Sequence, residues 1–161
     1  MGLYGWYLER ILPRCVDFGM RGEAFRELRP QCVGAAAGRV LELGFGSGLN
    51  LPHYGEGVDE LVALDPARLG RELAAKRIAD VGFPVSFAEL DGARWAVDDQ
   101  SFDFVTCTWT LFTVATVAAG IAAVCRVFRP AGQFPFWEHG PSLGYVLATW
   151  HALAPAIQVV R

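Results

Sequence analysis

Residues 39–50, with the sequence RVLELGFGSGLN, decide the fold class of this 161-residue chain. Aliphatic residues typical of a buried strand run directly into a turn that contains Gly44, Gly46 and Gly48. Glycine has no Cβ, so such a turn can take left-handed conformations and let its backbone approach a ligand closely. The stretch therefore predicts a strand that ends in a ligand-binding turn.

The acid beside this turn, Glu42, indicates the kind of ligand. The pattern is Glu-x-Gly-x-Gly-x-Gly, whereas dinucleotide-binding folds use Gly-x-Gly-x-x-Gly, and here the position three after Gly46 is Leu49. A carboxylate at this place suits a ligand with a cationic group better than one with a pyrophosphate. S-adenosylmethionine is such a ligand, because it carries both an ammonium and a sulfonium.

The composition indicates one apolar domain with little charge. Hydrophobic residues make up 53% of the chain, charged residues 19%, and the net charge is -3, so no basic face for nucleic acid is expected. The cysteines form no C-x-x-C pair, which argues against a zinc site or a disulfide framework, and no metal site is expected. With no signal peptide and no apolar run of ~18 residues, we predict a cytoplasmic protein with reduced thiols.

Strand and helix patterns alternate along the chain, which predicts an α/β fold with a parallel sheet covered on both faces. The expected strands cover the ranges 39–43, 60–65, 84–91, 102–108 and 133–138. The expected helices between and after them cover 49–54, 67–81, 114–128 and 142–159. We divide the single domain, 1–161, into a helical cap (1–38), a cofactor-binding core (39–140) and a C-terminal helix (141–161).

Polar residues end the expected strands, and parallel sheets bind ligands at the edge formed by the C-terminal strand ends. Asp65 ends the second strand, about 20 residues beyond the glycine turn, where a carboxylate can accept both ribose hydroxyls of an adenosine group. Because Asp65 directly precedes Pro66, it can also cap the following helix, and the two roles are compatible. The same edge is expected to hold Glu42, Asp91, Thr108 and Glu138.

Asp91 ends the third expected strand, where its carboxylate could accept the exocyclic amine of adenine while the Gly92 N–H faces a ring nitrogen. The alternative interpretation is an Asp-Gly turn without a ligand. His139 is a candidate base near neutral pH, but a structural hydrogen bond explains it equally well. No Gly-x-Ser-x-Gly nucleophile motif is present, and no catalytic residue is assigned.

Aromatic and aliphatic residues with scattered arginines fill residues 3–18. One interpretation is a helix that caps the domain. The other is an interfacial helix that contacts lipid or an apolar substrate. On this second interpretation, the helix makes peripheral contact with a membrane.

Six stretches together resemble the class I S-adenosylmethionine-dependent methyltransferases. More narrowly, they are similar to the methyltransferase type 11 branch, which includes ubiquinone/menaquinone-type and thiol-methylating methyltransferase-like proteins. The stretches are 40–54 (VLELGFGSGLNLPHY), 61–66 (LVALDP), 90–94 (LDGAR), 99–103 (DQSFD), 125–132 (CRVFRPAG) and 136–140 (FWEHG). The resemblance implies a Rossmann-like three-layer sandwich with strand order 3-2-1-4-5, S-adenosylmethionine as the cofactor, and methyl transfer to a small or lipophilic acceptor.

The resemblance also implies cofactor contacts in the glycine turn and at strand ends, at Glu42, Gly44, Gly46, Gly48, Asp65 and Asp91. To these we add their neighbours on the same edge, Asn50, Pro66, Gly92 and Thr108. Two alternatives stay open. One is a non-catalytic cofactor-binding or interaction module, and the other, disfavoured by the glycine spacing, is a nicotinamide-dependent oxidoreductase.

The last part of the chain departs from the family pattern. The family's sheet ends in an antiparallel hairpin of strands six and seven, and we expect this hairpin to be missing because the chain stops at Arg161. The fifth strand would then be an edge, which tolerates Pro135 and favours a homo-oligomer through the open edge. The family turn Arg-Pro-Gly-Gly reads Arg-Pro-Ala-Gly here, a small change only if Ala131 avoids a positive φ.

Overall fold

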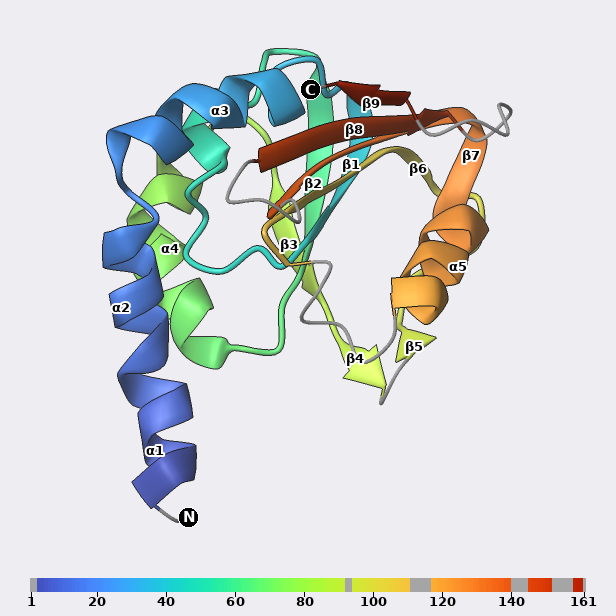
Figure 1. Ribbon diagram of the computed structural model, residues 1–161. Helices are drawn as coiled ribbons and strands as arrows, with labels where there is room; N and C mark the ends of the chain where they lie inside the picture. Colours follow the sequence, from blue (N-terminus) through green and yellow to red (C-terminus); the bar gives the residue numbers. More distant parts are fainter. Residues whose placement is uncertain (1–2, 92–93, 111–116, 140–144, 152–157, 161) are drawn as a thin grey trace.

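The computed structural model describes residues 3–91, 94–110, 117–139, 145–151 and 158–160, and Figure 1 shows their arrangement. The helices are α1 (Leu3–Arg10), α2 (Leu12–Gly19), α3 (Glu23–Val33), α4 (Arg68–Ala79), α5 (Val117–Val127) and the 3-10 helix η1 (Leu51–His53). The strands are β1 (Gly38–Leu43), β2 (Val58–Leu64), β3 (Val85–Ala88), β4 (Leu90–Asp91), β5 (Arg94–Trp95), β6 (Phe102–Thr108), β7 (Phe128–His139), β8 (Tyr145–His151) and β9 (Gln158–Val160).

The main sheet has the strand order β3-β2-β1-β6-β7-β8-β9. Its first five strands run parallel to one another, which confirms the predicted five-strand parallel arrangement of order 3-2-1-4-5. The strand order reverses between β1 and β6, and sheets of this kind bind ligands outside the C-terminal strand ends at that point.

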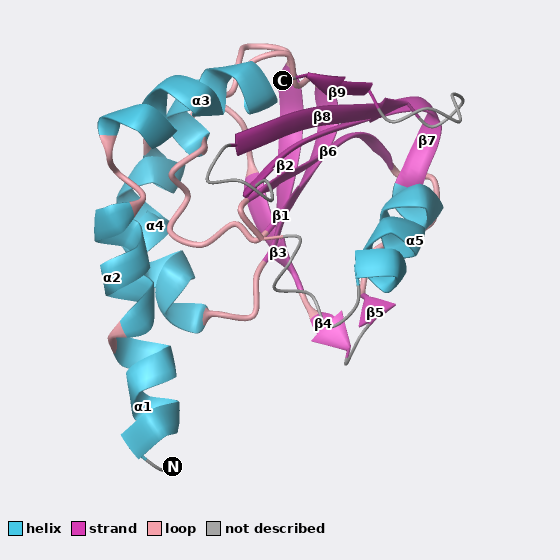
Figure 2. Ribbon diagram, viewed as in Figure 1, coloured by secondary structure: helices cyan, strands magenta, loops and turns pink. Residues whose placement is uncertain are grey.

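Helices cover both faces of the sheet, with α5 on one side and α4 and the N-terminal helices on the other (Figure 2). Successive side chains of a strand point to opposite faces. Leu41 of β1 therefore packs in one buried cluster with Val124 of α5, while Val40 packs in a second cluster with Ala74 of α4. Because Glu42 alternates with Leu41 in β1, its carboxylate points to the face of α4 and the N-terminal helices.

The third parallel strand is shorter than predicted. The last residue of β3, Ala88, pairs with Leu64, which is also the last residue of β2. A longer β3 would have no neighbour to pair with, and the chain instead enters the antiparallel ribbon of β4 and β5. Asp91 lies in β4, so the prediction that it ends a strand of the parallel sheet is wrong.

The described C-terminal residues form strands. β8 pairs antiparallel with β7, and β9 pairs antiparallel with β8. The prediction of a C-terminal helix is therefore wrong for residues 145–151 and 158–160, where two strands extend the sheet beyond β7. The sequence of β8, YVLATWH, is rich in aromatic and β-branched residues that favour strands, and its pairing satisfies backbone groups that an open β7 would leave unpaired.

The pairing of β8 also changes the interpretation of two residues. Pro135 lies opposite Thr149 of β8, so β7 is not the edge strand expected from the sequence, and association through an open β7 edge loses its basis. Ala131, near the start of β7, has a φ of 70°. The alanine that replaces the family's glycine thus holds an L side chain in the left-handed region, which costs about 1–2 kcal/mol.

Candidate functional site

The glycine turn has the left-handed backbone that its sequence predicts, with φ of 71° at Gly44, 55° at Gly46 and 73° at Gly48. A Cβ added to Gly44 would stand 2.0 Å from Thr110 Oγ1, so this close approach requires glycine. At Gly46 the nearest atom to an added Cβ is the Gly44 carbonyl oxygen, 3.9 Å away. On the Cβ side of Gly46, the described part of the chain therefore leaves open space that a ligand can approach.

Asp65 joins the end of β2 to the glycine turn. Its Oδ2 accepts a hydrogen bond of 2.7 Å from the Gly46 N–H, and its Oδ1 accepts one of 2.7 Å from the Ala67 N–H. Ala67 is the N-cap of α4, and Pro66 is exposed before it, so Asp65 shapes the approach to the helix without occupying the cap position. Each carboxylate oxygen has a further lone pair, to which a ribose hydroxyl could donate.

Glu42 lies at the centre of a buried polar network and is only 1% exposed. Its Oε1 accepts a hydrogen bond of 2.8 Å from Asn50 Nδ2, and its Oε2 accepts one of 2.8 Å from the Tyr54 hydroxyl. Asn50 Nδ2 also donates to Thr108 Oγ1 at 3.0 Å. The fold thus brings together three residues, Glu42, Asn50 and Thr108, that the sequence places at one sheet edge.

The charge on Glu42 is only partly compensated. The pKa of Glu42 is raised to about 7. Burial raises it most and nearby Asp65 adds to the increase, while the hydrogen bonds from Tyr54 and Asn50 and the charge of Arg29 lower it. Burial also lowers the pKa of the Arg29 guanidinium. A bound cation near this carboxylate would favour its ionised form, since an opposite charge stabilises a buried ion.

Three contributors to the site were not predicted from the sequence. Arg29 of α3 donates to Asn50 Oδ1 at 2.6 Å, but nothing in its helical pattern distinguishes it from a surface arginine. Tyr54 reaches Glu42 only because the chain folds back beyond η1. Gly70 did carry a signal, since a glycine inside a helical pattern often has a packing reason; a Cβ added there would stand 2.4 Å from the Gly46 carbonyl oxygen.

Of the remaining candidates, Glu138 lies beside the glycine turn. It is buried at the end of β7, and its Oε1 accepts a hydrogen bond of 2.9 Å from the Thr110 N–H. Since the Thr110 side chain fills the space above Gly44, Glu138 holds the segment after β6 against the turn. The side chain of Asp91 and all of Gly92 lie outside the described part of the chain.

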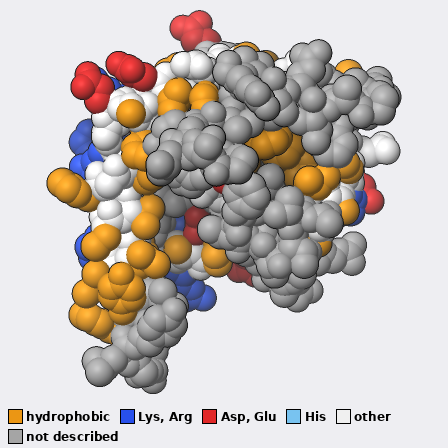
Figure 3. Space-filling view, in the orientation of Figure 1, with side chains coloured by type: hydrophobic (Ala, Val, Ile, Leu, Met, Phe, Trp, Pro, Cys, Tyr) orange, Lys and Arg blue, Asp and Glu red, His pale blue; other side chains and the backbone are white. Residues whose placement is uncertain are grey.

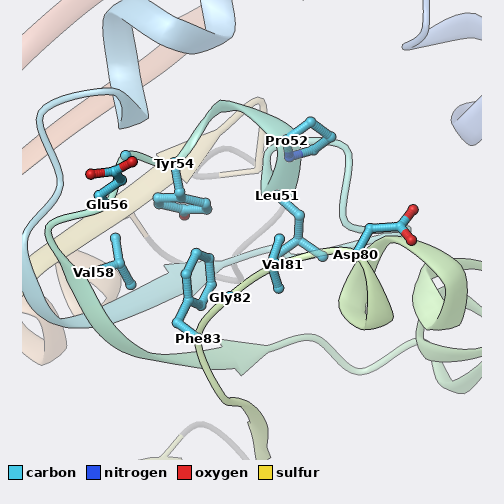
Figure 4. A pocket seen from close by; sticks show the side chains of 10 residues that line it. Leu51, Pro52, Tyr54, Glu56, Val58, Asp80, Val81, Gly82 and Phe83 are labelled. Carbon is cyan, nitrogen blue, oxygen red and sulfur yellow. The ribbon is translucent and has the colours of Figure 1, made fainter.

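A separate cavity of about 410 Å³ opens near the starts of β2 and β3 (Figure 4). Its lining residues are Leu51, Pro52, Tyr54, Gly55, Glu56, Val58, Asp80, Val81, Gly82 and Phe83. The Tyr54 ring meets Phe83 edge to face, with centroids 6.0 Å apart, while the Tyr54 hydroxyl reaches Glu42. Tyr54 is therefore shared between this cavity and the buried network.

Among the described residues, no group of three or more His, Cys, Asp or Glu side chains could hold a metal ion. All four cysteines fall within the described ranges and are free thiols. Within those same ranges, no helix has the length and hydrophobicity needed to cross a membrane.

The donor set fits an adenosine cofactor that carries a positive charge. Asp65 offers a carboxylate at the end of β2 for the ribose, Glu42 offers buried negative charge on the neighbouring strand, and Gly46 leaves room for close approach. The parallel sheet of order 3-2-1-4-5 that carries these residues is that of a Rossmann-like methyltransferase fold.

Family comparison gives the same class. Residues 41–136 match the model of the family described as "Methyltransferase domain", and the chain belongs to this family. The cofactor that the family implies is S-adenosylmethionine.

Curated relatives carry methyltransferase names. The chain is 36% identical to human thiol S-methyltransferase TMT1B, over 71% of this chain and 49% of that protein. It is 30% identical to demethylmenaquinone methyltransferase of Deinococcus radiodurans (83% and 55% covered) and 28% identical to phosphatidylethanolamine N-methyltransferase of Cereibacter sphaeroides (76% and 61% covered). The chain thus spans about half to three fifths of the length of these relatives.

Solved structures share the fold. An S-adenosylmethionine-dependent methyltransferase from Mesorhizobium loti is 26% identical, with a TM-score of 0.58 over 76% of this chain and 57% of that one. A putative S-adenosylmethionine-dependent methyltransferase from Methanococcus maripaludis is 19% identical, with a TM-score of 0.65 over 78% and 62%.

Proposed function

We propose that this protein transfers a methyl group from S-adenosylmethionine to a small or lipophilic acceptor. The observation that carries the proposal is the 2.7 Å hydrogen bond between Asp65 and the Gly46 N–H, beside the buried carboxylate of Glu42. This site combines a hydrogen-bond acceptor for ribose, a glycine backbone open to close approach and a negative charge at one edge of the sheet.

The proposed cofactor-binding residues divide by what each can offer. Asp65 binds the ribose, Glu42 faces the charged methionine end, and the glycines allow close backbone approach. Asn50 and Thr108 act through the network that they form with Glu42. The whole proposed set is Glu42, Gly44, Gly46, Gly48, Asn50, Asp65, Pro66, Asp91, Gly92 and Thr108.

The protein's contribution to the reaction is binding, orientation and exclusion of water. S-adenosylmethionine, when bound, supplies an electrophilic methyl group. Holding this group in line with a nucleophile can account for much of the rate, and no side chain is assigned as a base. Glu42 and Asn50 are each 1% exposed, so the network beside the turn is shielded from solvent.

Calorimetry with S-adenosylmethionine, S-adenosylhomocysteine and NADH tests the cofactor. We expect binding of the first two and none of NADH; the reverse result would favour an oxidoreductase. Transfer of radiolabelled methyl groups to a thiol, to demethylmenaquinone and to phosphatidylethanolamine then tests the activity, because relatives bear these acceptors in their names. Binding without transfer to any acceptor would favour a non-catalytic module.

We also propose that the protein touches a membrane surface through α1 and α2. Five large apolar side chains are exposed there, namely Trp6, Tyr7, Leu12, Val16 and Phe18, the last 81% exposed. Figure 3 shows hydrophobic side chains gathered over these helices. Exposed Arg10 and Arg14 would complement anionic headgroups, which suits the cytoplasmic leaflet and the predicted cytoplasmic location.

Flotation with vesicles of phosphatidylcholine, with and without phosphatidylglycerol, tests this contact. We expect binding that increases with the anionic lipid and is lost in a Trp6→Ser, Phe18→Ser double variant. A variant with unchanged folding and unchanged flotation would count against a role for this face.

A further inference from the structure

A buried arginine links the N-terminal helices to the polar centre of the site. Arg29 of α3 is 4% exposed. Its Nη1 donates to Asn50 Oδ1 at 2.6 Å, and its Nη2 donates to the Met20 carbonyl oxygen at 3.2 Å, just beyond α2. Its guanidinium carbon lies 5.1 Å from the centroid of the Trp109 ring. One side chain therefore contacts the α2–α3 connection, the segment after the glycine turn and the segment after β6.

The contact with Asn50 fixes which way its amide points. A guanidinium only donates hydrogen bonds, so the Asn50 carbonyl oxygen must face Arg29. The Asn50 Nδ2 is then directed to Glu42 Oε1 at 2.8 Å and to Thr108 Oγ1 at 3.0 Å. A reversed amide would set its carbonyl oxygen against the Glu42 carboxylate, leaving two acceptors in contact without a proton between them.

The contact with Trp109 supports an unusual backbone. Trp109 has a φ of 56°, which is rare for a bulky residue, costs about 1–3 kcal/mol and persists only where surrounding contacts hold it. The Phe25 ring meets the Trp109 ring edge to face at 5.0 Å, and the backbone N–H of Trp109 donates to the Trp137 carbonyl oxygen at 2.7 Å. With Arg29 packed over its ring, Trp109 is held from α3 and from β7.

We propose that Arg29 is a positioning residue of the cofactor site: from α3 it fixes the Asn50 amide and the Trp109 ring, and so sets how Glu42 meets the cofactor. The role in binding rests on the proposed function. The effect on side-chain arrangement does not, since the contacts exist in the protein alone.

The positive charge of Arg29 is a second way in which this residue affects Glu42. The titratable groups that face Glu42 are Arg29 and Cys32 from α3, Tyr54 from beyond η1 and Asp65 from the end of β2. Among them Arg29 is the cation, and it lowers the pKa of Glu42 against the effect of burial. Loss of Arg29 would therefore shift ionisation of Glu42, and with it cofactor affinity, to higher pH.

The test compares Arg29→Met and Arg29→Lys with Arg26→Met, a control on the same helix whose side chain is 68% exposed. We expect Arg29→Met to bind S-adenosylmethionine roughly tenfold more weakly, with the pH midpoint of binding moved upward. Arg29→Lys should restore the midpoint, because it keeps the cation. In an Asn50→Ala background Arg29→Met should add little further loss, since coupled residues are not additive.

A readout without cofactor separates this inference from the proposed function. In NMR spectra of the apo protein, Arg29→Met should shift the Asn50 side-chain amide and Trp109 indole resonances, whereas Arg26→Met should not. Wild-type protein that binds no S-adenosylmethionine would refute the proposed function and leave these resonances to decide the positioning role. Unshifted resonances, or affinity and pH midpoint equal to those of Arg26→Met, would overturn the inference.

Discussion

Gly70 of α4 packs directly against the backbone of Gly46. A Cβ added to Gly70 would stand 2.4 Å from the Gly46 carbonyl oxygen and 2.9 Å from its carbonyl carbon, and neither atom can rotate away as a side chain could. Helix α4 thus supports the glycine turn from one side while Asp65 binds it through the Gly46 N–H. The position of the turn depends on both contacts.

Gly70→Ala should therefore displace the turn. We expect a loss of about 1–3 kcal/mol of stability from overpacking and weaker binding of S-adenosylmethionine, measured by urea unfolding and calorimetry. Gly19→Ala is the matched control, because Gly19 is also helical and an added Cβ meets nothing within 4 Å. If both variants bind the cofactor like wild type, the contact between α4 and the turn does not matter for binding.

Asp65→Ala should weaken S-adenosylmethionine binding by roughly 1–3 kcal/mol, because it removes an acceptor for the ribose hydroxyls and the bond that holds Gly46. Calorimetry gives the dissociation constant, and the melting temperature of the apo protein shows how much stability is lost with the backbone hydrogen bonds to Asp65. Asp59→Ala, on an exposed residue of β2, is the control. An unchanged dissociation constant would remove Asp65 from the ribose role.

Stability of the apo protein should depend on Glu42 in a defined pH window. Burial raises the pKa of Glu42 from 4.5 to about 7, so the folded state binds a proton that the unfolded state has released between these values. The stability contributed by this proton is complete below pH 4.5 and is lost as pH rises through about 7. Glu42→Gln cannot lose this contribution, so its stability relative to wild type should increase with pH by at most about 1.4 kcal/mol per unit.

Urea unfolding at several pH values between 5 and 8 measures that difference. The variant must be compared with wild type at each pH, because His53 acts in the opposite direction: burial lowers its pKa, which makes stability rise with pH. Exposed Glu56→Gln controls for removal of a surface carboxylate. A difference between Glu42→Gln and wild type that stays constant with pH would contradict the buried titration. We also expect Glu42→Gln to bind S-adenosylmethionine more weakly.

Ala131→Gly should stabilise the protein by about 1 kcal/mol, because glycine adopts the left-handed φ of 70° without the Cβ clash. For a chain of this size the melting temperature should rise by roughly 2–4 °C. Ala122→Gly, in α5, should change stability with the opposite sign, since glycine destabilises a helix interior. A lower melting temperature for Ala131→Gly would show that the alanine methyl group is stabilising there.

Two errors in the sequence-based prediction have a common cause. The sequence pattern extends the third strand to Asp91, yet its pairing ends at Ala88 because β2 ends at Leu64. The last segment reads as an apolar helix, yet β8 pairs with β7. Strand length and the pairing of an edge depend on which neighbour is available, and that neighbour is distant in the sequence. Local patterns cannot report it.

The sequence by itself determined the parallel sheet, the left-handed glycine turn and the meeting of Glu42, Asn50 and Thr108 at one edge. Hydrophobic periodicity and the conformational freedom of glycine act within a few residues, so they can be recognised locally. Only the tertiary structure decided that Arg29 holds Asn50, 21 positions away, and that Gly70 packs on Gly46. These contacts depend on how the helices pack on the sheet, because burial leaves a polar group few partners and a small residue permits close approach.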